Sequence, residues 1–385
     1  MARWLEQQAT VRERRGLVRR PFARGAGDRF VDLASNDYLG LSSDPRLADA
    51  AAAAGSLWGT GATSSRLVAG TTELHLELEQ ELARLTGMEA ALVFSSGYLA
   101  NLGVITALGG PGTLIVADEH CHASMIDGFR LSRSRTESFG HNRPDEAHRL
   151  LAGRTEPRAL IAVESVYSVL GDEAPLARLV ALAEEHDAVL LVDEAHSLGV
   201  AGAGAHQGHG SVAGTVLAGH PNVVVTATLS KALGSQGGAV LGPPLLREHL
   251  INRSRSFIFD TGLAPASTAA ALAAVRIIRE EPWRAGAVRS NAGALARGLV
   301  SVLRAGESAL EQAAGAVQSI AMPSAASAVA ATDAARSAGV RIGCFRPPSV
   351  PDGASRLRLT ARATLTTHEI EHSCAVLRSI LEELP

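Results

Sequence analysis

The chain has 385 residues, 46% hydrophobic and 19% charged, so it can bury a large core without disulfides or metal ions. Its 36 basic and 39 acidic residues give a net charge of −3, and the one short basic cluster, at 12–24, does not favour a nucleic-acid partner. Apolar runs stay short of the ~18 residues that a transmembrane helix needs, and the polar start MARWLEQQAT is unlike a signal peptide. We therefore expect a cytoplasmic protein that binds neither nucleic acid nor membrane. Three widely spaced cysteines predict neither a disulfide framework nor a zinc ribbon.

Four short apolar runs, each with a polar residue at or near its end, predict buried strands of a parallel sheet. Helical patterns lie between some of them: Pro175 opens one helix, and leucines at helical spacing follow Thr71 and Thr72. This alternation predicts an α/β sheet with right-handed crossovers and helices on both faces. The predicted strands are 113–118, 159–164, 188–195 and 222–228.

The composition changes after these strands. From about residue 267 to residue 338 the chain is rich in alanine and helical in character, and two further strands follow. We therefore predict an N-terminal segment over 1–45, a large ligand-binding domain over 46–275 and a small C-terminal domain over 276–385. The two late strands are expected at 339–345 and 355–361.

Two of the predicted strands are followed by side chains that can carry chemistry. Asp193 stands near the end of one strand, His196 follows three residues later, and Lys231 comes just after the next strand. Open α/β sheets bind their ligands at the carboxyl ends of the strands. A strand-end aspartate can also be a simple cap, and a loop lysine a simple surface residue. The hydroxyls and glycine N–H groups around Lys231, however, suit a phosphate.

Two more segments add side chains and backbone groups that suit the same ligand site as Asp193 and Lys231. In VFSSGYLAN (93–101) a strand gives way to a helix near Gly97, and helix N-termini bind phosphate. DEHCHASMIDG (118–128) offers His122 as a ring to stack; it lacks the further ligands of a zinc site, so we expect no metal. An acid, an amine, a ring and a phosphate cradle are what pyridoxal phosphate requires. A dinucleotide site is the alternative, but no GxGxxG follows the first strand.

With these residues in view, the chain resembles the α-oxoamine synthases, dimeric pyridoxal-phosphate enzymes of fold type I, over nearly its whole length. The resemblance implies a fold-type I transferase in which a large, mostly parallel sheet domain binds the cofactor and a smaller C-terminal α+β domain follows. The matching blocks are LASNDYLGLS (33–42), GTGATSSRLVAG (59–70), SSGYLAN (95–101), HAS (122–124), GDEAPL (171–176), DEAHSLGV (193–200), TLSKALGSQGG (228–238) and SRLRLTA (355–361).

The resemblance also carries roles over to matching positions. The implied catalytic residues are Lys231, which forms the Schiff base with the cofactor, Asp193, which holds the pyridine nitrogen, and His122, which stacks on the ring. The other implied cofactor contacts are Gly97, Tyr98, Ser168, His196, Thr228 and, from the neighbouring subunit, Thr261. The implied substrate contacts are Asn36 and Arg358 at the carboxylate, Arg19 and Ser349 along the acyl path, and His122.

A narrower resemblance rests on FIFDTGLAP (257–265) and GCFRPPSVP (343–351). It points to the family members that condense L-alanine with a pimeloyl thioester in biotin biosynthesis, releasing CO2 and a free thiol; the carrier is either coenzyme A or a protein. Glycine- or serine-using members remain open: 5-aminolevulinate synthase, 2-amino-3-ketobutyrate ligase and serine palmitoyltransferase. A fold-type I aminotransferase would place an aromatic ring where His122 stands. A non-catalytic pyridoxal-binding protein would not need the intact pair Asp193 and Lys231.

Overall fold

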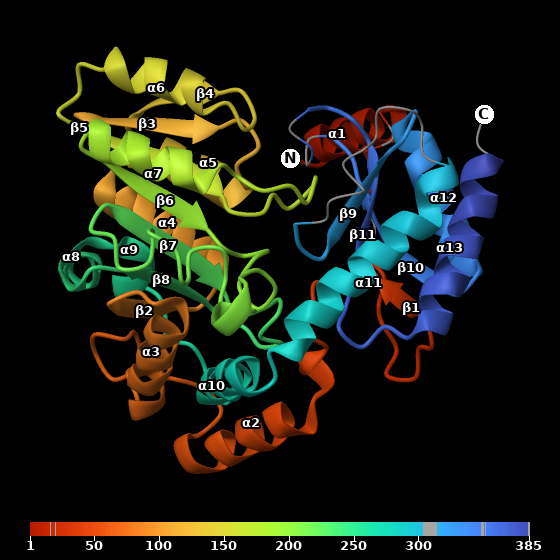
Figure 1. The fold of residues 1–385 in the computed structure, drawn as a ribbon, viewed down its shortest axis with the longest axis horizontal. Helices are drawn as coiled ribbons and strands as arrows, with labels where there is room; N and C mark the ends of the chain where they lie inside the picture. The colour runs from red at the N-terminus through yellow and green to blue at the C-terminus, as the bar shows by residue number, and fades with distance from the viewer. Residues whose placement is uncertain (16, 20, 303–313, 348–349, 351, 384–385) are drawn as a thin grey trace.

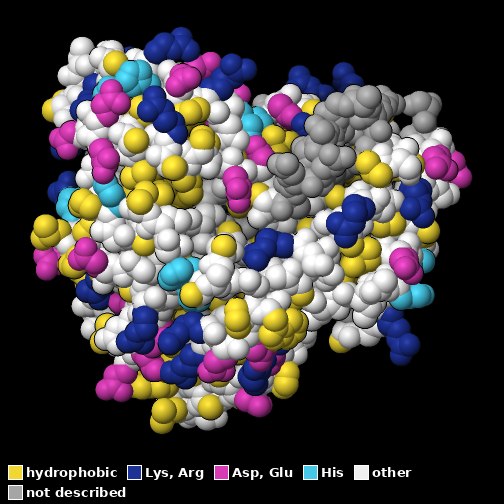
Figure 2. Space-filling model, in the orientation of Figure 1, with side chains coloured by type: hydrophobic (Ala, Val, Ile, Leu, Met, Phe, Trp, Pro, Cys, Tyr) yellow, Lys and Arg dark blue, Asp and Glu magenta, His cyan; other side chains and the backbone are white. Residues whose placement is uncertain are grey.

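The computed structural model describes the chain except for residues 16, 20, 303–313, 348–349, 351 and 384–385. The described residues form two lobes, each built on one β-sheet, and helix α11 (Trp283–Leu299) runs from the large lobe into the small one (Figure 1). Within these residues, no helix is both long and apolar enough to cross a membrane. On the face drawn in Figure 2, basic and acidic side chains are interspersed.

In the described chain, seven strands form the sheet of the large lobe, in the order β2-β8-β7-β6-β5-β3-β4. The strands from β7 to β4 are parallel, and β8 is antiparallel to both of its neighbours. The predicted α/β class with a mostly parallel sheet is thus confirmed. The strands are β2 (Ala90–Phe94), β3 (Thr113–Asp118), β4 (Arg135–Phe139), β5 (Arg158–Glu164), β6 (Ala188–Asp193), β7 (Val223–Thr228) and β8 (Gly238–Gly242).

Helices cover both faces of this sheet because its parallel strands are apolar on both sides. Along β5, Leu160 and Ala162 pack into a core with α4, α5, α8 and α9. Ile161 and Val163 pack into the opposite core with α3, α6, α7 and α10. These helices are α3 (Glu73–Thr86), α4 (Gly97–Leu108), α5 (Ala123–Ser132), α6 (Pro144–Ala152), α7 (Leu176–Glu185), α8 (Pro244–Arg253), α9 (Arg255–Ile258) and α10 (Pro265–Glu280).

The capping residues named from the sequence begin two of these helices. Thr72 is the N-cap of α3 and exchanges hydrogen bonds with His75, which satisfies N–H groups that the first turn leaves free. Pro175 precedes α7, where its fixed φ suits a helix start. Each helix then buries one apolar face, in α3 through Leu78, Leu82 and Leu85.

The small lobe has a sheet of four described strands in the order β1-β10-β11-β9, of which only β1 and β10 pair in parallel. Helices α11 and α12 pack on this sheet, and α13 packs on both of these helices. The bounds are β1 (Val31–Leu33), β9 (Val317–Ala321), β10 (Val340–Phe345), β11 (Arg356–Thr360), α12 (Ala325–Ser337) and α13 (Thr367–Glu382). The remaining helices are α1 (Ala2–Arg14), α2 (Pro45–Trp58) and the 3-10 turns Leu41–Ser43, Gly204–His206 and Val300–Val302.

The architecture bears on the domain limits expected from the sequence. Residue 275 lies inside α10, and the chain turns toward the small lobe only at Glu281 and Pro282. The expected N-terminal segment supplies β1, whose backbone groups are satisfied by β10 of the small sheet. The segment after it, α2, packs instead against α10 of the large lobe. Segments that are neighbours in the sequence therefore belong to different lobes.

Candidate active site

The carboxyl ends of three neighbouring strands place polar side chains in one row. Glu164 ends β5 and pairs in register with Asp193, the last residue of β6, which in turn pairs with Thr226 of β7. A cavity of about 250 Å³ lies at this edge, and all three residues line it. The strand ends thus bring together residues that are far apart in sequence, as expected for the ligand-binding edge of an open α/β sheet.

Lys231 reaches this cavity from the turn after β7. Its Nζ lies 2.8 Å from His196 Nε2, and His196 Nδ1 lies 2.6 Å from the hydroxyl of the buried Tyr38. Burial lowers the pKa of Lys231 to about 8, against the opposing attraction of Asp193 and Glu164. Burial and the nearby Lys231 charge hold the pKa of His196 well below its ordinary value. A neutral imidazole therefore faces an amine that loses its proton easily.

Asp193 and His122 are connected through Asn101, a buried residue of α4. The Asn101 amide donates to Asp193 Oδ2 at 2.7 Å and to Ser124 Oγ at 2.9 Å, while its carbonyl accepts from Thr226 at 2.7 Å. Ser124 Oγ lies 2.7 Å from His122 Nδ1. One asparagine thus orients both the carboxylate and, through the serine, the imidazole on the cavity wall.

The other end of the cavity is built for an anion. Helix α4 begins there with Ser96 as N-cap and Gly97 and Tyr98 as first residues, so unpaired N–H groups and the positive end of the helix dipole face the cavity. Thr228 and Ser230 add hydroxyls that lie 2.7 Å apart. A Cβ at Gly97 would approach Thr228 Cβ to 3.0 Å, closer than an ordinary van der Waals contact, so glycine suits the close packing of this helix start against β7.

Arg358 and Asn36 lie together on the small-lobe side. A short hydrogen bond joins Arg358 Nη2 to Asn36 Oδ1, and Arg358 Nη1 donates to the carbonyl of Ser168 at 2.9 Å. Tyr38 connects this pair to the cavity, because its hydroxyl also lies 3.1 Å from Asn36 Oδ1 while contacting His196. A buried guanidinium with an amide beside it is a suitable receptor for a carboxylate.

The residues singled out from the sequence separate into four groups in the structure. One group lines the cavity itself: Gly97, Tyr98, His122, Asp193, His196, Thr228 and Lys231. A second, Asn36, Ser168 and Arg358, is hydrogen-bonded next to it. Thr261 and Arg19 are exposed and lie away from the cavity wall; Thr261 bridges to Ser65, and Arg19 follows Val18, whose carbonyl accepts from Arg346. Ser349 lies outside the described residues.

The sequence reasoning missed several polar residues of the site: Tyr38, Asn101 and Glu164, and with them Ser124 and Thr226. Glu164 is buried in the same row as Asp193, its Oε2 accepts from the Ser168 N–H at 3.0 Å, and its Oε1 has no hydrogen-bond partner among the described residues. Burial and repulsion by Asp193 raise the pKa of Glu164 to about 8. Its place at a strand end was the signal available in the sequence. Asn101 and Tyr38 stand inside quoted motifs but had no such positional mark.

The donor set of this cavity fits pyridoxal phosphate: an amine for its aldehyde, a carboxylate for its pyridine nitrogen, an imidazole for its ring and a helix start for its phosphate. A comparison with family models matches residues 28–377 to the class I and II aminotransferases. The chain therefore belongs to this family of fold-type I enzymes, and its cofactor is pyridoxal phosphate.

Within that family, curated relatives named 8-amino-7-oxononanoate synthase are similar to almost the whole chain. The relative from Mycolicibacterium gilvum (strain PYR-GCK) is 50% identical over 98% of this chain and 97% of its own length. The relative from Mycobacterium avium (strain 104) is 51% identical over 99% and 97%. The chain is thus similar along its full length to enzymes of this name.

Solved structures share the fold. Serine palmitoyltransferase from S. paucimobilis superposes with a TM-score of 0.89 at 31% identity, covering 98% of this chain and 96% of that one. The 8-amino-7-oxononanoate synthase from Francisella tularensis superposes with a TM-score of 0.78 at 25% identity, covering 92% and 98%. Overall shape is therefore shared with enzymes of more than one name, whereas identity of about one half is found with the curated relatives named 8-amino-7-oxononanoate synthase.

Proposed function

We propose that the chain condenses L-alanine with a pimeloyl thioester to give 8-amino-7-oxononanoate, CO2 and a free thiol. The observation that carries this proposal is a half-buried lysine amine, set against a neutral imidazole, in a cavity that also holds Asp193 and the start of α4. Identity of about one half to enzymes of that name, along the whole chain, supports the choice of substrates.

The reaction makes one carbon–carbon bond and breaks one carbon–sulfur bond and one carbon–carbon bond, while the Cα–H bond is broken and later remade. Alanine Cα bonds to the thioester carbonyl carbon, the C–S bond breaks to release the thiolate, which takes a proton from water, and the Cα–carboxyl bond breaks to release CO2. Bound pyridoxal phosphate supplies an electron-poor ring that stabilises negative charge at Cα. Every other task falls to side chains.

Lys231 suits the proton transfers. With a pKa of about 8, a fraction of its amine is neutral near pH 7 and can take the Cα proton, then return it to the same carbon after CO2 leaves. His196, held neutral, can accept a hydrogen bond from the ammonium that forms. Asp193 places a fixed negative charge at the cavity wall, where it favours a cationic ring.

Arg358 and Asn36 are proposed to hold the carboxylate of alanine. The η nitrogens of Arg358 donate to Ser168 and Asn36, and its buried Nε, which has no hydrogen-bond partner among the described residues, is a further donor for a carboxylate. A carboxylate fixed there orients the Cα–H bond for the amine of Lys231. We propose that coenzyme A or a carrier protein delivers the acyl group and that the chain works in the cytoplasm. The roles of Arg19 and Ser349 on the acyl path stay predictions.

We further propose that the working enzyme is a homodimer with shared sites. Thr261 is exposed, and its segment is fixed to the 59–70 loop by a β-bridge to Ser65 and by the Gly262 N–H donating to Ser64 at 3.0 Å. Large apolar side chains beside these two segments are exposed, which is unusual unless another surface covers them. They are Leu57, Trp58, Leu67, Val68 and Phe259. A second copy would cover this face and bring Thr261 to the partner's phosphate.

An assay of purified chain with three amino acids and several thioesters tests the proposed reaction. L-alanine, glycine and L-serine would each be paired with pimeloyl, acetyl, succinyl and palmitoyl thioesters, and the products weighed by mass spectrometry. We expect the alanine and pimeloyl pair to have the highest kcat/KM. A preference for L-serine with the palmitoyl thioester would contradict the proposal and indicate the reaction named for the structurally similar serine palmitoyltransferase. Bound cofactor without any turnover would indicate a binding protein.

A further inference from the structure

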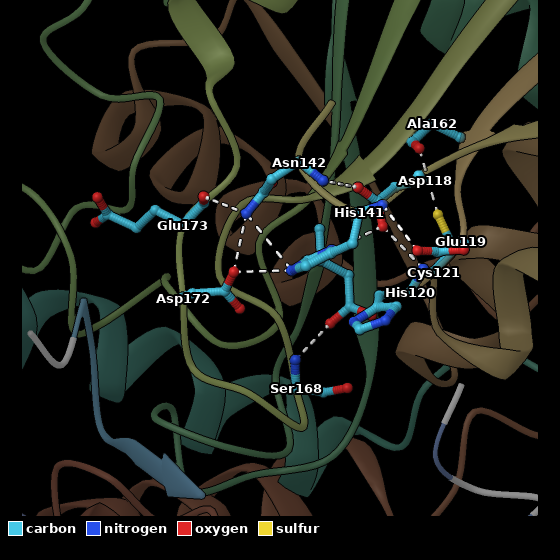
Figure 3. A network of polar contacts seen from close by, with 12 residues as sticks. Asp118, Glu119, His120, Cys121, His141, Asn142, Ala162, Ser168, Asp172 and Glu173 are labelled. Atoms are coloured by element: carbon cyan, nitrogen blue, oxygen red, sulfur yellow. Dashed lines mark hydrogen bonds and ion pairs between the residues drawn. The ribbon is translucent and has the colours of Figure 1, made fainter. Parts of the chain in front are cut away.

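A second cluster of titratable side chains lies beside the active site and is not used by the proposed reaction (Figure 3). At its centre is His141, in the turn between β4 and α6. The ring Nδ1 lies 3.0 Å from Asp118 Oδ1, at the end of β3, and Nε2 lies 2.8 Å from Asp172 Oδ2, in the loop after β5. One imidazole thus bridges carboxylates from two different segments.

The geometry indicates that this imidazole is charged. Burial alone would lower the pKa of His141, but its hydrogen bonds to Asp118 and Asp172 and their negative charges raise it to about 9. The groups that face the ring are Asp118, Asp172, His120, stacked at 4.0 Å between centroids, and Tyr167, edge-on at 4.4 Å; Glu119 accepts from the His141 backbone N–H. Both ring nitrogens therefore donate.

Asn142 repeats the same bridge beside it. Its backbone N–H donates to Asp118 Oδ2 at 2.9 Å, and its side-chain amide donates to Asp172 Oδ2 at 2.8 Å. The residue has a φ of 56°, a left-handed conformation that asparagine tolerates better than most side chains. Two adjacent residues are thus held in the shape that lets them contact both carboxylates.

Each bridged segment carries part of the active site. Asp118 Oδ1 also accepts from the His120 N–H at 2.8 Å, and the same turn ends at His122, the N-cap of α5 on the cavity wall. Asp172 belongs to the loop that includes Ser168. That residue donates its N–H to Glu164 and offers its carbonyl to Arg358.

We propose that His141 is a positioning residue, a charged clamp that fixes the His122 turn and the Ser168 loop relative to each other and thereby sets Arg358 for the amino-acid carboxylate. In this role His141 does not contact the reacting atoms. The predicted effect on carboxylate binding rests on the proposed function, whereas the predicted restraint of the Ser168 loop does not. Loss of the clamp should weaken alanine binding more than it slows the chemical steps.

Hydrogen exchange tests the restraint directly. The loop contains hydrogen-bonded amides: the Tyr167 N–H donates to the Asp172 carbonyl at 2.9 Å, and the Ala174 N–H donates to the Ser165 carbonyl at 3.1 Å. In His141→Gln, amides of 165–174 should exchange at least about tenfold faster, while β5 and β6 keep their protection. The matched control is His220→Gln, because His220 makes a similar 2.8 Å contact with Glu184 outside the cavity lining. It should leave 165–174 unchanged.

Alanine binding tests the consequence. Titration of the cofactor-loaded enzyme with L-alanine, followed by the absorbance of the bound cofactor, should give a dissociation constant about tenfold higher in His141→Gln, with kcat changed less. Asp172→Asn should produce a similar loss, and the double variant should lose little more, because both changes open the same bridge. Asp172→Asn also serves as the working variant if His141→Gln does not fold.

Three outcomes would overturn the proposal: unchanged exchange over 165–174, faster exchange spread evenly over the whole chain, or additive effects of His141→Gln and Asp172→Asn on alanine affinity. The second of these would mean that the residue only stabilises the fold. If the unaltered enzyme does not respond to alanine, the proposed function fails, and the exchange measurement alone decides whether the restraint exists.

Discussion

Lys231 is the single lysine in a chain with 36 lysines and arginines, so no other side-chain amine can bond an aldehyde. We predict that borohydride reduction of the cofactor-loaded chain attaches one cofactor per chain, and that peptide mapping finds it on Lys231. In Lys231→Ala only the N-terminal amine remains, and the label should disappear. A variant that kept the label in full would move the cofactor away from Lys231.

Asp193 and Glu164 occupy the same row of the sheet but should respond differently to loss of charge. Asp193→Asn removes the carboxylate proposed to favour a cationic ring, and we predict a fall in kcat of about two or more orders of magnitude with cofactor still bound. Glu164→Gln is the matched control: because burial raises the Glu164 pKa to about 8, this side chain is mostly neutral at pH 7, and an amide should cost much less. Equal losses in the two variants, in steady-state kinetics at pH 7, would contradict these roles.

Glu164 also predicts a pH dependence of stability. Its pKa rises from 4.5 in the unfolded chain to about 8 in the folded one, so between these values the unfolded state gives up its proton first. The free energy of unfolding should therefore decrease as pH rises from about 4.5 to 8, by up to a few kcal/mol from this residue. Urea unfolding at pH 5 and pH 8 should show a smaller decrease for Glu164→Gln than for the unaltered chain. The same decrease in both would mean that Glu164 is not the group responsible.

Strand β11 carries two arginines that the sequence alone could not tell apart, since alternation puts Arg356 and Arg358 on the same side. The structure separates them: Arg358 is buried and bonds Asn36 and Ser168, whereas Arg356 pairs with Asp352. Arg358→Lys keeps the charge but loses the planar fork, and should raise the KM for alanine roughly tenfold. Arg356→Lys should change it little. If the KM for alanine rises in Arg356→Lys and not in Arg358→Lys, the carboxylate binds Arg356 and the assignment to Arg358 is wrong.

Elements with a strong local pattern could be predicted from the sequence. The runs at 113–118, 159–164, 188–195 and 222–228 lie on β3, β5, β6 and β7 because buried parallel strands need continuous apolar residues. Strand β1 could not be foreseen, because three residues carry no period and their partner, β10, follows about 300 residues later. Strand β8 is five residues long and bounded by glycines, which read as a turn.

The residues of the site also fall into those that the sequence could place and those that it could not. Asp193 and Lys231, at or just after strand ends, could be placed at one edge of the sheet by topology alone. Asn101 could not be placed in this way. It lies on α4, and its side chain reaches Asp193 because α4 packs closely against β7 at Gly97. Glu164 ends the predicted strand 159–164, so its strand-end position was available in the sequence, but its pairing with Asp193 depends on the register between β5 and β6, which the two sequences do not specify.

At the scale of the whole molecule, the phosphate end of the cavity depends on hydroxyls and N–H groups of one chain, while Thr261 stays exposed on the same chain. If Thr261 completes the partner's site, each site needs Lys231 from one subunit and Thr261 from the other. In a mixed dimer, one chain carries a change at Lys231 and the other a change at Thr261. One of its two sites then contains both changes, and the other site contains neither.

This gives the prediction that depends on the entire assembly. Lys231→Ala alone should be inactive, and Thr261→Ala alone should bind cofactor more weakly and turn over slowly. After the two are unfolded and refolded together in equal amounts, half of the dimers should be mixed, each with one intact site, so activity should recover to about a quarter of that of the unaltered enzyme. A chain with both changes, mixed with Lys231→Ala, is the control and should recover nothing. Light scattering would report the dimer independently. A fully active monomer, or no recovery in mixed dimers of proven composition, would show that Thr261 does not act across the interface.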